Sequence, residues 1–393
     1  MQTQLTIPVI IKYSKDISQT LTAFAGVQNQ ISKCAFNRGK PLGALDLHRK
    51  TYSKIKRLSS QMTCSAIRLT AGSYSSARRN RHNLISPFKF KPRALFLIGK
   101  KGRDASFTQD GKLSIWTTTG RKRFTYAIPE HFKERFTSAI EYDSLNITER
   151  SGKFLAHLCI TVNMPEPKGV FPVGVDRNET NPIVAVDLAG REFFENGLVR
   201  RIKNTKIRKL RKRLNAKLVA KKAEGMNTHS VIRLLKRLGH DQRNRTKTYT
   251  QTVAKRFVEW CPKDAIIILE DLNMPQLKRS ANYKIRKGVR RRLSQWFRSL
   301  LETSIRNKAT QNGIAVASVS PYNTSQNCSR CGIKGTRQKH RFSCSSCGFV
   351  SHADTNAAVN IRNRFTVLRG SGLLSMSPEA YSLGKPPALA GGN

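Results

Sequence analysis

Four cysteines form the most specific chemical motif in the sequence. The pairs CSRC, residues 328–331, and CSSC, residues 344–347, are separated by twelve residues. Two C-x-x-C pairs at this spacing can place four thiolates tetrahedrally around one zinc ion. Disulfides and an iron–sulfur cluster are alternatives, but a basic cytosolic protein disfavours the first and the spacing disfavours the second. We therefore expect one structural zinc ion, with the ligands Cys328, Cys331, Cys344 and Cys347.

Three carboxylates at the ends of expected elements suggest a second metal chemistry. Asp176 ends FPVGVD, Glu270 ends AIIILE, and Asp354 opens DTNAAVNI. Mg²⁺ prefers oxygen ligands, and two such ions can activate water and neutralise the leaving oxygen during phosphodiester hydrolysis. Each carboxylate alone could instead form a turn or cap an element. They form one site only if the fold brings the strand ends together, and the sequence does not prove that it does.

The charge balance indicates a polyanionic partner. Lys and Arg total 72 and Asp and Glu total 24, so the formal net charge is +48. When such a surface contacts phosphates, counterions are released and binding is favoured. Nucleic-acid binding is therefore a better explanation of the positive charge than solubility alone. An anionic membrane would call for a long apolar span or a dominant amphipathic basic helix, and we expect no membrane partner. The start, MQTQLTIPVIIKYSK, is typical of a strand and not of a signal peptide, so we expect a cytoplasmic, nucleoid-associated protein of a prokaryotic cell.

The N-terminal half is expected to combine strands with a helical insertion. Residues 3–13 alternate like a strand, residues 15–87 have helical periodicity, and residues 90–165 hold short β-like runs between turns. This order predicts a β-barrel-like module. Its strand aromatics could stack on bases, although such residues more commonly belong to a core: Phe96, Trp116, Phe124 and Tyr126. The scattered cysteines are expected to be reduced core residues: Cys34, Cys64, Cys159 and Cys261.

A proline-rich segment, VNMPEPKGVFP, predicts a boundary near residue 170. Beyond it, FPVGVD and VAVDLAGREFF resemble the strands of a hairpin, and AIIILE is a continuous apolar run typical of a strand buried on both faces. Residues 289–312 predict a basic amphipathic helix, and IAVASVS predicts another strand. The last 25 or so residues are expected to form a flexible tail.

A strongly basic helical pair is expected between the first strands and AIIILE. Residues 200–222 hold twelve Lys or Arg and no acidic residue, with an apolar face of Ile207, Leu210, Leu214 and Leu218. A second helix has apolar positions at Val231, Leu234, Leu235 and Leu238 and is expected to end at Gly239. A merely solvated face would be costly because neighbouring like charges repel. We expect the pair to lie along a nucleic-acid backbone, with contacts from Arg208, Arg211 and Lys212.

The motifs GVDRN, IIILEDLNM, YNTSQNCSRCG and FSCSSCGFVSHADTNAAVNI occur in the order and spacing of the TnpB family. TnpB proteins are transposon-encoded relatives of type V CRISPR effectors. The similarity is most specific over residues 265–362 and extends across residues 172–365. It implies an α/β multidomain fold. In the N-terminal half it implies a wedge β module (1–14 and 88–168) with a helical recognition insertion (15–87). In the C-terminal half it implies an RNase H-like (RuvC) nuclease domain (169–321 and 351–366) that contains a basic hairpin (199–256). A zinc ribbon (322–350) and a tail (367–393) complete the chain.

The resemblance further implies an RNA-guided DNA endonuclease that binds a guide RNA and double-stranded DNA. It assigns catalysis with two Mg²⁺ ions to Asp176, Glu270 and Asp354, zinc to the four cysteines, and a phosphate contact to Arg341. Asp187 and Asp271 fall outside the catalytic positions. Many family members have G-x-D-x-G where this chain has GVDRN. The alternatives are a small type V CRISPR effector, a nuclease-silent RNA-guided repressor, an RNA-independent transposase, and a zinc-ribbon RNA-binding protein. The sequence does not indicate the oligomeric state.

Overall fold

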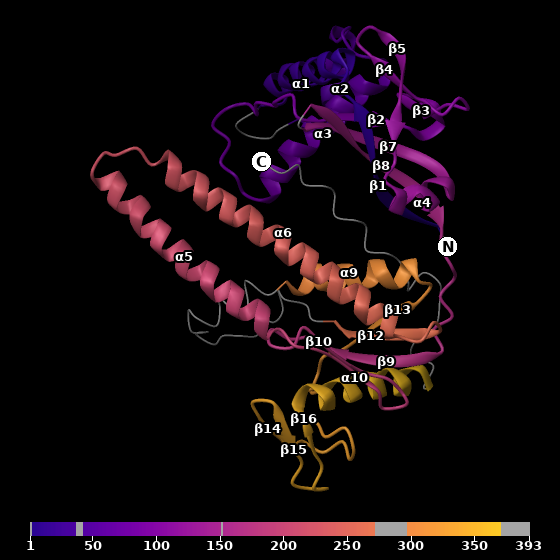
Figure 1. Ribbon diagram of the computed structural model, residues 1–393, viewed down its shortest axis with the longest axis vertical. Helices are drawn as coiled ribbons and strands as arrows, with labels where there is room; N and C mark the ends of the chain where they lie inside the picture. The colour runs from indigo at the N-terminus through magenta and orange to yellow at the C-terminus, as the bar shows by residue number, and fades with distance from the viewer. Residues whose placement is uncertain (1, 37–41, 151, 272–296, 371–393) are drawn as a thin grey trace. The chain divides into compact units, whose positions relative to one another are not determined.

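The computed structural model describes residues 2–36, 42–150, 152–271 and 297–370. The chain divides between Asn163 and Met164 into two compact units, close to the boundary expected near residue 170 (Figure 1). No helix in these ranges is long and apolar enough to cross a membrane.

The N-terminal unit is built on an antiparallel sheet with the strand order β2-β7-β8-β1-β6. Its strands are β1 (Gln2–Lys12), β2 (Leu95–Ile98), β6 (Tyr126–Ala127), β7 (Ala139–Arg150) and β8 (Lys153–Asn163). β1 pairs with β8 along its whole length, and its alternate residues Ile7, Val9 and Ile11 are fully buried. A second antiparallel sheet contains β3 (Ala105–Phe107), β4 (Leu113–Thr117) and β5 (Gly120–Phe124). The expected β-rich region is therefore confirmed, and β7 is a strand that the sequence pattern did not single out.

Helices occupy the region between β1 and β2, as predicted. They are α1 (Lys15–Ala35), α2 (Ala44–Thr51), the short η1 (Tyr52–Lys54) and α3 (Ser60–Arg79). The Ser59 side chain caps α3 by accepting a hydrogen bond from the backbone N–H of Met62. The shorter helices η2 (Lys100–Gly102), η3 (Glu130–Phe132) and α4 (Lys133–Thr137) lie among the later strands. Cys34, expected in the core, is exposed near the end of α1, so that prediction was wrong.

The C-terminal unit contains a mixed sheet with the order β11-β10-β9-β12-β13. The strands are β9 (Phe171–Asp176), β10 (Ile183–Val186), β11 (Glu192–Glu195), β12 (Ala265–Glu270) and β13 (Ala315–Val319). β9, β10 and β11 form an antiparallel meander, whereas β12 runs parallel to both β9 and β13. Every residue of β12 is buried, as its apolar run predicted.

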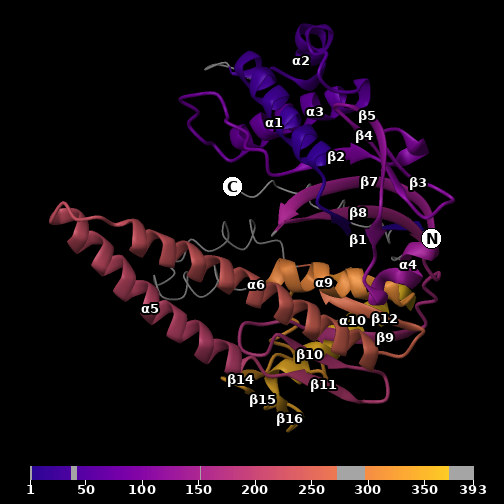
Figure 2. The ribbon, with the colours of Figure 1, turned by 45° about the horizontal axis from the view of Figure 1, so that its top comes forward.

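Helices cover both faces of this sheet, which explains the burial of β12 (Figure 2). α6 (His229–Trp260) and α9 (Arg298–Gln311) cover one face and α10 (Ala353–Gly370) covers the other, whereas α5 (Leu198–Ala223) contacts α6 and has no buried residue. Ile267 and Leu269 pack in the core that includes α6 and α9. Ile266 and Ile268 pack on the opposite face, in the core that includes Ile361 and Phe365 of α10. Because successive side chains of β12 point to opposite faces of the sheet, the strand contributes to two separate cores.

The helical hairpin of α5 and α6 differs from its prediction at Gly239. This glycine lies inside α6 and is buried, so the second helix does not end there. A Cβ atom at Gly239 would lie 2.9 Å from Nη2 of Arg211, so the glycine leaves room for that guanidinium against α6. No residue of α5 is buried, and Leu210 is 45% exposed. The expected apolar seam is therefore shallow.

Two other boundaries shift or lie outside the described ranges. The expected helix over 289–312 is described only from Arg298, and residues 289–296 lie outside the description. α10 continues to Gly370, so the expected tail does not begin at residue 367. Residues 371–393 lie outside the described ranges.

Candidate metal centres

The strand pattern brings Asp176 and Glu270 to one edge of the sheet. β9 and β12 are parallel, with Val175 opposite Leu269, so the two acidic residues that follow these positions are neighbours at the carboxyl ends of both strands. Glu270 lies on the same face of β12 as Ile266 and Ile268, and this face packs against α10. Both carboxylates are 8% exposed.

Gly174 lets α10 approach β9 closely enough to add the third carboxylate. A Cβ atom at this position would lie 2.0 Å from the carbonyl oxygen of Ala358 and 2.7 Å from the Cβ of Arg362. Asp176 shares the face of Gly174 because it lies two residues further along the strand. Asp354 stands in the first turn of α10 and is 1% exposed. Three acidic residues from distant parts of the sequence therefore converge.

The electrostatics of Asp176 reflect this convergence. Burial raises the pKa of Asp176 from 3.8 to about 7, with further contributions from the negative charges of Asp354 and Glu270. Burial likewise raises the pKa of Glu270. Buried carboxylates that repel each other are favourable ligands for a divalent cation, because its charge offsets both penalties. The donor chemistry therefore suits Mg²⁺, although the oxygen atoms of the three carboxylates do not all lie within 4.8 Å of one another.

Neighbouring side chains hold Glu270 from two directions. Thr324 donates its hydroxyl hydrogen to Oε1 of Glu270 at 2.5 Å. Arg177, which is almost fully buried, donates to the backbone carbonyl of Glu270 at 2.8 Å and forms an ion pair with Glu302 of α9, also at 2.8 Å. The strand end that carries Glu270 is thereby tied to α9.

Asp354 has a donor on each carboxylate oxygen. Arg337 of strand β14 (Thr336–Gln338) contacts Oδ1 at 2.8 Å, and the amide of Asn181 contacts Oδ2 at 2.8 Å. The backbone N–H of Asp354 donates to Nδ1 of His352 at 3.2 Å. Asp354 is therefore fixed at the start of α10 by residues from three separate segments.

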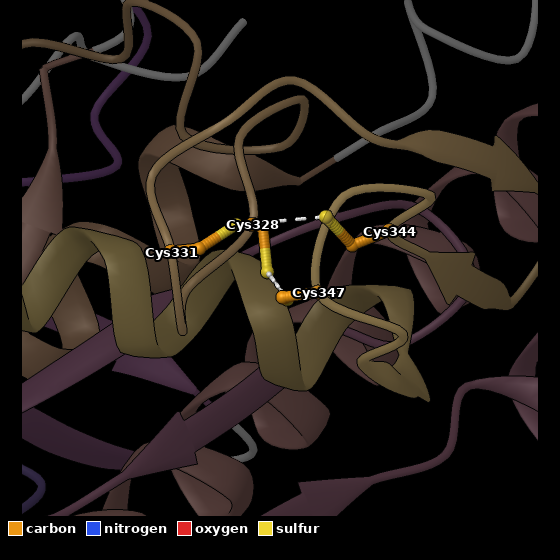
Figure 3. Close-up of side chains that lie close together, drawn as sticks. All are labelled: Cys328, Cys331, Cys344 and Cys347. Carbon is orange, nitrogen blue, oxygen red and sulfur yellow. Dashed lines mark hydrogen bonds between the residues drawn. The ribbon is translucent and has the colours of Figure 1, made fainter.

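The four predicted zinc ligands converge (Figure 3). Their sulfur atoms all lie within 4.8 Å of one another, with 3.7 Å between Cys328 and Cys347 and 3.6 Å between Cys331 and Cys344. Zn–S bonds of about 2.3 Å in a tetrahedron require S–S separations of about 3.8 Å. All four are free cysteines, and these separations exceed the S–S bond of about 2.05 Å in a disulfide. The set fits one zinc ion.

Backbone turns explain how the two cysteine pairs reach this geometry. Gly332 and Gly348 follow the pairs with φ of 77° and 69°, a conformation that favours glycine. Hydrogen bonds from the backbone N–H groups of Cys347 and Ser346 lower the pKa of Cys344, which favours its thiolate form. The sheet beside the cluster consists of β14, β15 (Arg341–Ser343) and β16 (Val350–His352).

The cysteine cluster is also tied to α10, which carries Asp354. Oδ1 of Asn356 accepts the backbone N–H of Ser329, within the first cysteine pair, at 2.8 Å. The side chain of Asn360 donates to the carbonyl oxygens of Thr324 and Asn327. These contacts connect the zinc ligands, Thr324 and the carboxylates through one helix.

Other predicted residues lie away from the carboxylates. Arg341 is exposed on β15, and it is Arg337 that contacts Asp354. Asp187 accepts hydrogen bonds from Arg191 in the turn between β10 and β11, whereas Asp271 is exposed after β12. Arg208 and Lys212 are exposed on α5, and Arg211 is half-buried beside Gly239.

Sequence reasoning missed two residues near the carboxylates: Asn178, which donates to Asp176, and Asn181, which donates to Asp354. Their spacing in DRNETN is typical of an Asx turn and was the available signal.

Comparison with known proteins gives a partial but specific match. Residues 299–361 match the family model described as the Cas12f1-like TNB domain. A CRISPR-associated endodeoxyribonuclease Cas12f1 from an uncultured archaeon is 30% identical over 154 residues, covering 33% of this chain and 28% of its own length. A TnpB-like protein of Aquifex aeolicus is 28% identical over 113 residues, covering 28% of this chain and 35% of its own length. The matches thus span about a third of the length of these relatives.

The fold is similar to that of a solved structure described as the cryo-EM structure of the Cas12f1-sgRNA-target DNA complex. The TM-score is 0.58 at 16% identity, covering 89% of this chain and 83% of the other. The mixed α/β architecture is therefore shared with that protein. The sequence matches confirm the predicted resemblance: over about a third of its length, the chain is similar to TnpB-like and Cas12f1 proteins.

Proposed function

We propose that this chain is an RNA-guided DNA endonuclease with an RNase H-like (RuvC) catalytic unit. Three buried acidic residues carry the proposal: Asp176 and Glu270 end parallel strands, and the charges of Glu270 and of Asp354 on α10 raise the pKa of Asp176, which a divalent cation would offset. The sheet order β11-β10-β9-β12-β13, with a meander followed by parallel strands, supports the RNase H-like assignment. The similar Cas12f1 protein is an endodeoxyribonuclease, which supports the nuclease class.

The three carboxylates would hold two Mg²⁺ ions, which when bound activate water and neutralise the leaving oxygen. Thr324 and Arg177 would orient Glu270, and Arg337 would partly balance the charge of Asp354. The four cysteines would hold a structural zinc ion that fixes α10 and Arg337 relative to the sheet. Guide RNA and double-stranded DNA are the proposed partners, consistent with the net charge of +48.

The remaining assignments belong to the same proposal. The N-terminal unit would supply the wedge β module (1–14 and 88–168) and its recognition insertion (15–87). The C-terminal unit would supply the nuclease domain (169–321 and 351–366) and the zinc ribbon (322–350). The exposed cations of α5, including Arg208 and Lys212, would contact RNA phosphates. A short DNA motif would be read by the protein, and base pairing would supply the remaining specificity.

Co-expression with the native flanking DNA tests the proposal. Co-purified RNA would be sequenced, and plasmids carrying a matching target would be incubated with the complex and Mg²⁺. The proposal predicts a discrete RNA and RNA-dependent cleavage. Target binding without cleavage would instead indicate a repressor, RNA-independent joining of DNA ends would indicate a transposase, and RNA binding without DNA recognition would indicate an RNA-binding protein.

A further inference from the structure

The turn between β9 and β10 is built around the side chain of Asn178. Its Oδ1 accepts backbone N–H groups from Thr180 at 2.9 Å and Asn181 at 2.6 Å. An amide whose oxygen faces two N–H donors must direct its nitrogen the other way. That nitrogen, Nδ2, donates to Oδ2 of Asp176 at 3.1 Å. The turn itself therefore fixes the direction of the donor toward Asp176.

Asn181 extends the same arrangement to a second carboxylate. Its side chain is buried, and its Nδ2 lies 2.8 Å from Oδ2 of Asp354. Its backbone carbonyl accepts the N–H of Asn178 at 3.3 Å, which closes the turn. One short turn thus holds an aspartate of β9 and an aspartate of α10.

We propose that Asn178 and Asn181 are positioning residues that set the separation and orientation of Asp176 and Asp354 for divalent metal binding. This role rests on the proposed function of the carboxylates. A neutral amide donor suits it, because it stabilises a carboxylate without cancelling the charge that attracts the cation. A cationic donor such as Arg337 does cancel that charge. The backbone at Asn178 has no positive φ, so other side chains fit there without strain.

Binding of Mn²⁺ to the zinc-loaded full chain, measured by calorimetry without nucleic acid, tests this role. Asn178→Ala and Asn181→Ala should each weaken Mn²⁺ binding roughly tenfold or more, as expected for loss of a hydrogen bond to a charged group. Asn178→Ser can keep the turn through its hydroxyl acceptor but is too short to reach Asp176, so it should show the same loss. Asn363→Ala, at an exposed asparagine on α10, should bind as the parent does.

The unfolding temperature without Mn²⁺ and the zinc content separate positioning from general structural support. Weaker Mn²⁺ binding in folded, zinc-loaded variants supports the role. Unchanged Mn²⁺ affinity in Asn178→Ser and Asn181→Ala overturns it and leaves the metal centre intact. If Asp176→Ala binds Mn²⁺ as tightly as the parent, the metal centre itself is overturned, and the positioning role with it.

Discussion

At the scale of single residues, the candidate site is defined by buried acidic side chains. Asp176 is buried beside two other carboxylates, and its pKa is raised to about 7. The surrounding donors Thr324, Asn178 and Asn181 stabilise these groups without supplying positive charge. A divalent cation would therefore gain both oxygen ligands and favourable electrostatics.

The raised pKa of Asp176 predicts a pH-dependent stability of the magnesium-free protein. The folded state keeps the proton up to about pH 7, whereas the unfolded chain releases it near 3.8. The free energy of unfolding should therefore fall as the pH rises between these values. Asp176→Asn removes this dependence. The free energy of unfolding of the variant, relative to that of the parent, should therefore rise by about 2–3 kcal/mol as the pH goes from 5 to 7.

Urea unfolding of parent and variant in zinc-containing, magnesium-free buffer measures this difference. Asp187→Asn is a comparison at a buried aspartate outside the cluster. A stability difference between Asp176→Asn and the parent that stays constant from pH 5 to pH 7 would contradict the account.

At the scale of elements, close packing and hydrogen bonds place the carboxylates. α10 reaches β9 because Gly174 has no side chain, and hydrogen bonds from Asn356 and Asn360 join α10 to the cysteine segment. The position of Asp354 therefore depends on a glycine in one element and on cysteines in another.

Gly174→Ala should separate α10 from β9. The new methyl group would meet backbone atoms, which cannot rotate away, so we expect a loss of about 1–3 kcal/mol in the free energy of unfolding and weaker Mg²⁺-dependent cleavage. Denaturant unfolding measures the first effect. Gly26→Ala in α1 meets nothing within 4 Å and should instead be neutral or stabilising. Wild-type stability in Gly174→Ala would show that the close approach is not required.

Cys344→Ser should uncouple the zinc cluster from the carboxylates. Loss of one thiolate weakens zinc binding, and the contacts of Ser329 with Asn356 and of Arg337 with Asp354 lose their support. We expect a lower zinc content, measured by mass spectrometry, and a cleavage rate reduced at least tenfold while RNA affinity is retained. Cys34→Ser, at an exposed cysteine outside the cluster, is the control. Full cleavage by zinc-free protein would exclude the coupling.

The sequence predicted the secondary-structure elements better than it predicted the tertiary contacts between them. The apolar run of β12 and the paired C-x-x-C motifs have local signatures: the structure buries β12 and brings the four cysteines together. The parallel pairing of β9 with β12 joins residues far apart in the chain, so no local pattern could reveal it. Gly239 was misread because a glycine inside a helix resembles a terminus unless its neighbour, here Arg211, is known.

At the scale of the whole molecule, positive charge is the dominant property. The chain has 72 basic and 24 acidic residues, and α5 exposes many of its cations without burying any residue. Self-repulsion of this size is relieved by a polyanion, so binding of RNA should depend strongly on salt.

Replacing Arg208, Arg211 and Lys212 together with Gln should weaken RNA binding and reduce its salt dependence. Each lost phosphate contact should lower the slope of log affinity against log salt by about 0.7–0.9. A matched variant replaces Lys100, Lys112 and Lys133, which already form ion pairs with carboxylates. The two variants lose equal charge, so equal effects on RNA affinity would exclude a specific role for the hairpin.

The most direct test of the central claim is Mg²⁺-dependent cleavage of a matched DNA target by RNA-loaded Asp176→Ala and Glu270→Ala. The account predicts that both variants bind RNA and target as the parent does but lose cleavage by at least a thousandfold. Asp271→Asn, which alters the exposed carboxylate next to Glu270, should cleave normally. Cleavage at the parental rate by either alanine variant would contradict the account, because the converged carboxylates would then not be the nuclease site.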